Sequence, residues 1–323
     1  MKWPTLLLIL LLPLCLLVGI WAGPVPLGPR ELWDGLRYAS ADTAPIIREL
    51  RVPRVLLAFL VGGSLSITGA ALQALVRNPL ADPYLLGLSG GAGLGAVIAI
   101  AVNPSWPWAV PAAAFAGAAA AVGLVYRLSA VAGRRLDPRV LLLAGVVVGA
   151  FAGALMTAVV SLSSASQLRR AYLWLLGGFG AASWRSLTVF AAYAVLPLAA
   201  LFLSARALDL LSLGEESAKH LWAEVERDKR IVYVATALLT AASVAVSGVI
   251  GFVGLVVPHA ARRIWTPLHR ELLPVAFLGG GMFMVLADAL ARTVVRPLEL
   301  PVGAVTALVG VPLFAVLLRR TLT

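Results

Sequence analysis

Residues 52–76 read VPRVLLAFLVGGSLSITGAALQALV, and RNPLADP follows at 77–83. Arg54 is the only charged residue in the first run. A helix that crosses the hydrocarbon core of a bilayer needs about 20 mostly apolar residues. The run 52–76 is therefore predicted to span a membrane as a helix. Pro79 and Pro83 behind it predict an extended turn, because a proline disfavours helical geometry at the residue before it.

Comparable apolar runs recur along the whole chain of 323 residues, which is 61% hydrophobic and only 13% charged, with a mean hydropathy of +0.95. A soluble chain carries about a quarter charged residues. The composition excludes a soluble enzyme and a disordered chain, and the single Cys15 excludes a disulfide scaffold. We expect an all-α polytopic membrane protein, a single transmembrane domain over residues 1–323, with about ten spans: 5–22, 52–76, 84–102, 108–128, 140–162, 187–205, 231–247, 250–264, 272–291 and 302–318.

The orientation follows from the basic residues between these runs. Ten spans place both termini on one side, and Lys and Arg are more frequent in the segments on that side, so both termini are predicted to be cytoplasmic. The run 5–22 could be a cleaved signal peptide, but we expect a retained helix because many spans follow it. The excess of Lys and Arg in the segments expected to be cytoplasmic accounts for the net charge of +11. No nucleic-acid partner is expected, because the basic residues form no continuous stripe.

Motifs for catalysis are missing from the sequence. No G-x-x-x-x-G-K-[ST] phosphate loop occurs, and the only lysines are Lys2, Lys219 and Lys229. His220, His259 and His269 are not spaced as a metal site, so no metal ligands are expected. The chain is therefore predicted to be neither an ATPase nor another enzyme, and to hold no cofactor of its own.

Five stretches with polar residues, glycine or proline are unusual for generic spans: RVPR at 51–54, QALVRNPLADPYLLG at 73–87, LGEESA at 213–218, GVIGFVGLVVPH at 248–259 and ELPVGAVT at 299–306. In these stretches, which recur in order over nearly the whole chain, the sequence resembles the permease subunits of type II ABC importers. That family takes up ferric siderophores (iron transport), haem and vitamin B12.

The resemblance implies the family's ten-helix permease fold in the cell inner membrane. It also implies a homodimer, with runs 140–162 and 302–318 lining the pathway through the lipid bilayer. Two ATP-binding subunits, which hold ATP and Mg²⁺, and a periplasmic or lipid-anchored substrate-binding protein would complete the importer. The segment WLLGGFG at 174–180 is closer to the vitamin B12 permease than to siderophore permeases. The sequence leaves open which chelate is carried.

The acidic segment at about 206–229 resembles the family's coupling loop, which docks on the ATP-binding subunit. By this resemblance Leu213 and Gly214 supply a turn, Glu215 and Glu216 favour the start of the following helix, and Ala218 leaves room for the partner. Leu221 also belongs to the motif. Trp222 follows it where the family commonly has glycine, which leaves the turn geometry there open. A solvated loop without a partner is the alternative.

Two further groups of residues match family sites. Asn78 and Leu80, together with Pro138 and Arg139, match the cytoplasmic gates; a rigid turn without a gating role is the alternative. Arg51, Arg54 and Arg292 match the arginines that receive glutamates from the binding protein. Asp288 and Arg292 stand four apart on one expected helix and could instead pair with each other; for Arg51 and Arg54, interfacial anchoring is the alternative.

A different class of protein, a self-sufficient secondary transporter or channel, remains possible on composition alone. Such a protein needs ionisable residues in mid-membrane as ion or proton relays. None lies well inside an expected span, since Asp288 falls close to the outer end of its helix. The sequence therefore favours the importer subunit.

Overall fold

The computed structural model describes the chain except residues 1–2, 132–136, 215–217, 219–223 and 323. The described residues form helices joined by short connections, and no strand occurs among them. The elements up to the first long connection are α1 (Trp3–Trp21), α2 (Pro29–Arg37), the π-helix η1 (Ile46–Arg51), α3 (Val52–Val76), the 3₁₀-helix η2 (Pro83–Leu86), α4 (Leu88–Val102) and α5 (Ala109–Val131). The remainder are α6 (Pro138–Ser161), α7 (Ala165–Leu175), α8 (Trp184–Leu203), α9 (Ala205–Ser212), α11 (Val225–Ser247), α12 (Val253–Ile264), α13 (His269–Thr293) and α14 (Val302–Leu322).

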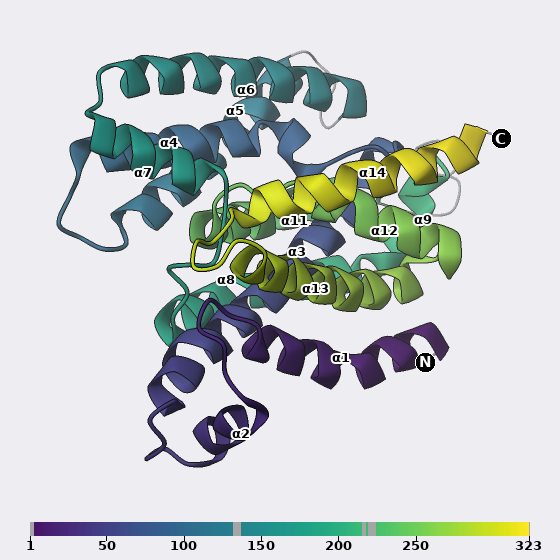
Figure 1. Cartoon of the computed structure of the whole chain (residues 1–323). Helices are drawn as coiled ribbons and strands as arrows, with labels where there is room; N and C mark the ends of the chain where they lie inside the picture. Colours follow the sequence, from purple (N-terminus) through teal and green to yellow (C-terminus); the bar gives the residue numbers. More distant parts are fainter. Residues whose placement is uncertain (1–2, 132–136, 215–217, 219–223, 323) are drawn as a thin grey trace.

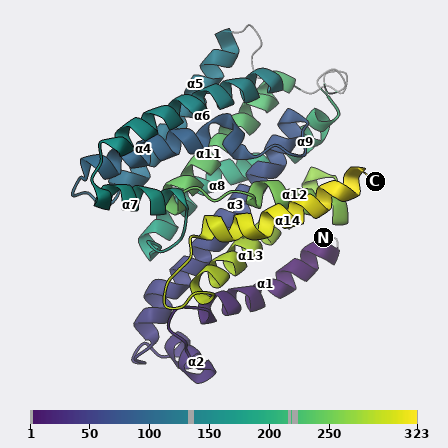
Figure 2. The same cartoon turned by 45° about the horizontal axis from the view of Figure 1, so that its top comes forward.

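The long helices run along one common direction. Helix α1 begins and α14 ends at the same end of the bundle, which also carries α9 (Figures 1 and 2). This end is termed the N/C end, and the end that carries α2 and α7 is termed the far end. The start of α1 and the end of α14 thus lie at one end of the bundle. The cytoplasmic position of the termini stays a prediction.

Six helical segments of the described chain are long and apolar enough to cross a bilayer: Ile46–Val76, α5, α6, α8, α11 and α13. Helices α1, α4 and α14 contain shorter apolar segments. Each expected span corresponds to a helix. The run 250–264, however, yields only the 12-residue α12, about 18 Å at 1.5 Å per residue, which is too short to cross the bilayer core of about 30 Å. The count of ten spans stays a prediction.

Helix α3 lies at the centre of the molecule and is almost completely buried. It packs against α13, α12 and α11, while α4, α5, α6 and α7 form a group of their own on one side (Figure 2). Small residues allow the central helices to approach closely, as is usual where lipid supplies no hydrophobic driving force between helices. Gly69 of α3 faces the backbone of Gly254 in α12, and Gly62 faces that of Gly280 in α13.

A backbone break separates α11 from α12 at residues 248–252. Gly248 has φ +68° and Phe252 φ +70°, and the freed backbone groups find partners within the chain. The N–H of Gly178 donates to the carbonyl of Ser247 at 2.7 Å. The hydroxyl of Tyr84 donates to the carbonyl of Ile250 at 3.1 Å and lies 3.2 Å from the Ile250 nitrogen. Non-helical backbone is tolerated at membrane depth only where protein or a cavity surrounds it.

Gly69→Ala should destabilise the protein, because a Cβ atom there would collide with the backbone of Gly254. We expect a loss of about 1–3 kcal/mol in the free energy of unfolding, the usual cost of overpacking. Thermal unfolding in mild detergent measures it. Gly153→Ala on α6 is the matched control, since a Cβ at Gly153 meets nothing within 4 Å. Equal melting temperatures for the two variants would contradict the close approach of α3 and α12.

Candidate functional site: far-end ion cluster and N/C-end loops

An ion cluster at the far end joins α3, α13 and the connection to α14. The Nη2 atom of Arg54 lies 2.9 Å from both Asp288 Oδ1 and Glu299 Oε2. Asp288 also binds Arg292, whose Nε lies 2.9 Å from Oδ2. The Asp288 and Arg292 side chains are almost completely buried, whereas Glu299 is 34% exposed. Two guanidinium groups thus pair with one buried carboxyl group, which is how buried ionisable groups are normally accommodated.

Arg51 and Arg292 bind the C-terminal carbonyl groups of α1. Arg51 donates to the carbonyls of Ile20 at 3.0 Å and Trp21 at 2.8 Å. Arg292 donates to the carbonyls of Gly19 and Ala22. The last four carbonyls of a helix lack partners within the helix, and cations near this end also interact favourably with the helix dipole. The two arginines therefore hold α1 against α3 and α13, which makes α1 an integral part of the bundle.

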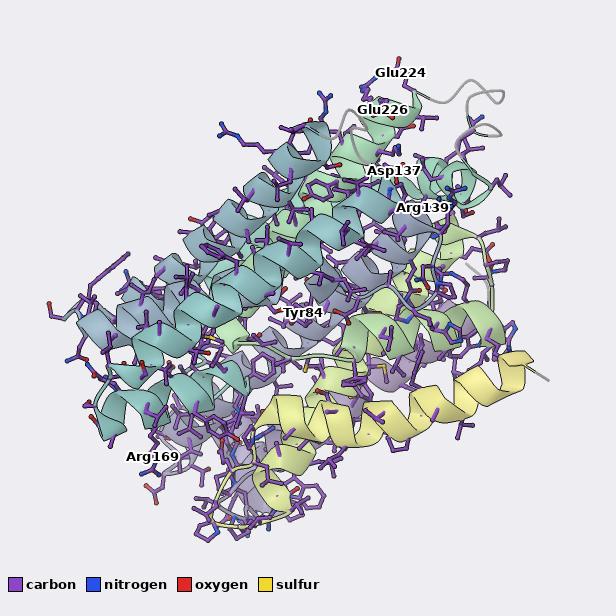
Figure 3. The ribbon with its side chains drawn as sticks, turned by 90° about the horizontal axis from the view of Figure 1, so that it is seen from above. Tyr84, Asp137, Arg139, Arg169, Glu224 and Glu226 are labelled. Atoms are coloured by element: carbon purple, nitrogen blue, oxygen red, sulfur yellow. The ribbon has the colours of Figure 1, made fainter. Side chains whose placement is uncertain are left out.

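The three arginines expected at a docking surface thus have different surroundings. Arg51 and Arg292 are buried and engaged inside the chain, so the Asp288–Arg292 pair that the sequence left open is formed. Arg54 and Glu299 reach closer to the surface. Other arginines at this end are exposed, among them Arg169, which Figure 3 shows at the opposite end of the molecule from Arg139. Docking of a binding protein on Arg51, Arg54 and Arg292 stays a prediction.

The loop that follows α3 has a defined geometry at the N/C end. The side chain of Asn78 accepts the N–H of Leu80 at 2.9 Å, which forms a local turn. Leu80 is 42% exposed, so its apolar side chain is available to a neighbour. Asp82 caps η2 by accepting the N–H of Tyr84 at 2.9 Å. The gating role expected of Asn78 and Leu80 stays a prediction.

The second expected gate lies at the start of α6, where Asp137 accepts the N–H of Arg139 at 2.9 Å and Pro138 occupies the first helical position. Asp137 and Arg139 lie at the same end of the molecule as Glu224 and Glu226, the start of α11 (Figure 3). Helix α6 also packs on η2, because Gly145 faces the carbonyl of Leu85. The two expected gates are thus joined through η2. Their gating role stays a prediction.

Part of the expected coupling segment is described. Leu213 is 64% exposed, and Gly214 has φ +107°, a conformation that a side chain would strain. Ala218 is completely buried within this chain, and the expectation that it leaves room for a partner stays a prediction. Glu215, Glu216, Leu221 and Trp222 lie outside the described residues.

Two contacts connect the coupling segment to the rest of the N/C end. The carboxylate of Asp209 on α9 accepts the backbone N–H of His269 at 2.9 Å, and its Oδ1 lies 2.7 Å from the ring Nδ1. A side chain at Gly214 would lie 3.3 Å from Nη1 of Arg77, the residue before the Asn78 turn. The expected coupling segment therefore contacts the start of α13, and its Gly214 faces the side chain of Arg77, next to the expected gate.

A buried glutamine joins three elements in the same region. Gln73 on α3 donates to the carbonyls of Gly254 at 3.2 Å and Ala81 at 3.5 Å, and its Oε1 accepts a hydrogen bond from Arg262 at 2.6 Å. Sequence reasoning quoted Gln73 within a motif but gave it no role, and it missed the partners of Tyr84, Asp209 and His269. For Gln73, a signal was present in the sequence, because it is a polar residue inside an apolar run. For Tyr84, Asp209 and His269 no local signal exists, because their partners are distant in sequence.

Among the described residues, no group of three or more His, Cys, Asp or Glu side chains could hold a metal ion. The fold and these sites define a multi-pass membrane protein whose polar groups gather at the two ends of its helices.

Comparison with known proteins identifies the family. The model of the FecCD transport family matches residues 8–320, and the chain belongs to this family. It is 41% identical over 321 residues to the hemin transport system permease protein HmuU of Yersinia pestis, covering 97% of this chain and 94% of the relative. It is 42% identical to the cobalamin import system permease protein BtuC of Halobacterium salinarum, covering 88% and 76%.

The fold agrees with this assignment. A solved structure of a metal-chelate type ABC transporter in an inward-facing conformation superposes with a TM-score of 0.89 at 30% identity, and the likeness covers 98% of both chains. The expected type II importer permease fold is confirmed by this similarity, and the family places the chain as a multi-pass protein of the cell membrane.

Asp288→Asn should be strongly destabilising, because it leaves the Arg54 and Arg292 charges without their shared carboxylate. Breaking a buried ion pair costs about 3–5 kcal/mol, measurable as a lowered unfolding temperature in detergent. The control is Arg30→Gln, which removes an exposed pair with Asp34 and should cost less than about 1 kcal/mol. A similar decrease in unfolding temperature in both variants would show that the ion cluster does not stabilise the far end.

Asp82 predicts a dependence of stability on pH. Burial raises the pKa of its carboxyl to about 6, although the hydrogen bond from the Tyr84 N–H lowers it. The folded state therefore binds this proton more tightly than the unfolded state, and the resulting stabilisation is complete below about pH 4 and is lost as the pH rises through about 6. Asp82→Asn retains an acceptor for the cap. Its unfolding temperature relative to the unchanged protein should rise over this range; parallel curves would contradict the raised pKa.

Proposed function

We propose that this chain is the transmembrane permease subunit of an ATP-binding cassette importer that carries a metal chelate across the inner membrane. One observation carries the proposal: the family match extends over residues 8–320, and the superposition with the metal-chelate transporter covers 98% of the chain. Both therefore include the N/C-end loops as well as the helices. The named relatives import hemin and cobalamin, and we propose cobalamin, haem or a ferric siderophore as the cargo.

The proposed assembly is a homodimer with two ATP-binding subunits and a substrate-binding protein. ATP and Mg²⁺ belong to the ATP-binding subunits in this proposal, since the sequence contains no phosphate loop. The exposed side chains of Leu143, Val147 and Phe151 give α6 an apolar face. That face supports the proposal that α6 meets a second copy and lines the pathway.

The contacts at the N/C end support a route for coupling. We propose that the ATP-binding subunit docks on the segment at about 206–229, with Leu213 as an exposed apolar contact. Movement there would reach α13 through Asp209 and His269, and would reach Asn78 and Leu80 through Arg77, whose guanidinium group Gly214 faces. Leu80 would then close or open the pathway against its counterpart in the second copy and against the start of α6.

At the far end we propose that the binding protein docks over the ion cluster. Arg51 and Arg292 would support this surface from within, and Arg54 would offer its guanidinium group to an acidic residue of the binding protein in exchange with Glu299. A planar guanidinium forms bidentate pairs with carboxylates. Docking should then weaken as ionic strength rises, because exposed charges are screened.

Transport in proteoliposomes tests the proposed function. The permease is reconstituted with its candidate ATP-binding subunit and binding protein, and uptake of labelled cobalamin, haem and ferric siderophore is measured with ATP. We expect ATP-dependent uptake of one of these chelates only when all three components are present. Uptake by the permease alone, driven by an ion gradient, would contradict the proposal and favour a secondary transporter.

Asp209→Ala tests the coupling route within this assembly. It removes both hydrogen bonds from the start of α13, and a hydrogen bond to a charged group contributes about 1.5–3 kcal/mol. We expect uptake per ATP hydrolysed to fall by about tenfold, while ATP hydrolysis continues. Ser212→Ala is the matched control on the same helix, because its hydroxyl donates only to the α9 backbone at Asp209. Equal coupling ratios in both variants would rule out this route.

A further inference from the structure

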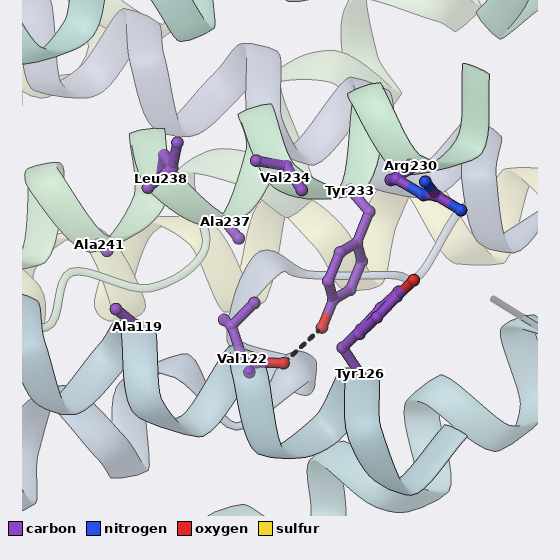
Figure 4. A pocket seen from close by; sticks show the side chains of 10 residues that line it. Ala119, Val122, Tyr126, Arg230, Tyr233, Val234, Ala237, Leu238 and Ala241 are labelled. Carbon is purple, nitrogen blue, oxygen red and sulfur yellow. Dashed lines mark hydrogen bonds between the residues drawn. The ribbon is translucent and has the colours of Figure 1, made fainter. Parts of the chain in front are cut away.

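A groove lies between α5 and α11 on the side of the bundle, away from the ion cluster. It encloses about 340 Å³ and is bordered by residues of these two helices only. The lining is apolar except at one end (Figure 4). Neither the coupling route nor the expected gates include this groove.

Small residues create the groove. Ala119 and Gly123 on α5 face Ala237 and Ala241 on α11 across it, and a Cβ atom at Gly123 would meet nothing within 4 Å. Leu238 forms an outer wall and is 41% exposed, so the groove opens sideways, where the bilayer surrounds a helix of this length and hydropathy. An apolar groove that opens to lipid has room for a hydrocarbon chain.

Polar groups gather at the other end of the groove. Figure 4 shows Arg230, Tyr233 and Tyr126 together at this end, with Ala241 and Ala119 at the opposite end. The hydroxyl of Tyr233 donates to the carbonyl of Val122 at 3.1 Å, and its ring lies 6.2 Å from that of Tyr126. The two tyrosines thus connect α5 and α11 and close the groove at this end. The exposed Arg230 supplies a cation beside them.

The position of Arg230 along α11 identifies the leaflet. Helix α11 starts at Val225, and Glu224 and Glu226 lie at the N/C end (Figure 3). Arg230 therefore stands near that end, at the depth of lipid head groups, while the apolar part of the groove extends towards the bilayer centre. With the N/C end cytoplasmic, the cation faces a leaflet that carries anionic lipids.

We propose that this groove is a binding site for an anionic phospholipid of the cytoplasmic leaflet. One acyl chain lies between Ala119, Gly123, Ala237 and Ala241, and the phosphate binds Arg230, with the Tyr126 hydroxyl at the same end. The apolar lining excludes a polar solute, and Arg230, the cation among the lining residues, selects a negatively charged head group. The site concerns lipid binding by the full chain and is independent of the proposed import function.

A photo-crosslinking experiment tests the proposal. The full chain is placed in phosphatidylcholine nanodiscs with a small amount of phosphatidylglycerol that carries a diazirine in one acyl chain, and the labelled peptides are mapped by mass spectrometry. We expect labelling at residues 119–123 and 237–241, competed by unlabelled phosphatidylglycerol and not by phosphatidylcholine. A cation near the membrane surface contributes about 1 kcal/mol, so Arg230→Gln should reduce this labelling about fivefold.

Two variants separate the groove from general attraction to the membrane surface. Arg127→Gln removes an exposed charge from the same end of α5 without touching the groove, and it should change the labelling by less than about twofold. Gly123→Leu fills the groove while Arg230 remains, and it should abolish labelling at residues 237–241. Unfolding temperatures confirm that the variants are folded.

Several results would overturn the site. An equal loss of labelling in Arg127→Gln and Arg230→Gln would show that the lipid is held only by diffuse electrostatic attraction. Equal competition by unlabelled phosphatidylcholine would show a non-selective contact with the lipids that surround the protein. Labelling that survives in Gly123→Leu would place the lipid elsewhere. Absence of labelling in nanodiscs that hold dimers, with labelling in those that hold monomers, would show that a second copy covers the groove.

Discussion

Lipid offers no hydrogen-bond partners to backbone N–H and carbonyl groups, and this fold depends on how the protein supplies them. A carbonyl or N–H exposed in the hydrocarbon region costs several kcal/mol, and helices leave such groups unpaired at every end. At the end of α1 the carbonyls are bound by two buried arginines, Arg51 and Arg292. At the break between α11 and α12, the Gly178 N–H binds the carbonyl of Ser247 and the Tyr84 hydroxyl binds that of Ile250. The neighbouring Gly177 carbonyl accepts the N–H of Val302 at the start of α14. The positions of α1, α12 and α14 all depend on these contacts.

The same contacts join distant parts of the chain. Tyr84 belongs to η2, which follows the Asn78 turn, and its hydroxyl holds the break before α12. Gln73 holds the carbonyls of Ala81 and Gly254 together, so the loop after α3 cannot move without an effect on α12. In a transporter, elements that share buried hydrogen bonds move as a unit, and motion is left to the interfaces between units. The group α4–α7 contacts α11 and η2 more extensively than it contacts α3 (Figure 2).

Charge is distributed in keeping with these constraints. The buried side chain of Asp288 pairs with the guanidinium groups of Arg54 and Arg292, whereas pairs such as Arg30–Asp34 remain exposed and contribute little. The cluster thus stabilises the far end and still leaves Arg54 and Glu299 near the surface. This combination of a buried frame and an ion pair near the surface supports the proposed docking of a binding protein at the far end.

The sequence by itself determined the helices and the family. Runs such as 52–76 and 302–318 have the length and hydropathy of spans, and α3 begins and ends where expected, because a helix that crosses the bilayer must be predominantly apolar over about 20 residues. The short α2 and α7 were not expected, since they are too polar for hydropathy to reveal. Helix α11 starts six residues before the expected span, because its first turns are charged and lie at the end of the bundle. Only the tertiary structure decided what the polar residues do: that Arg51 and Arg292 cap α1, that Ala218 is buried, and that Asp209 meets His269. Those roles depend on partners that are distant along the chain, and no local pattern records which helices will lie side by side.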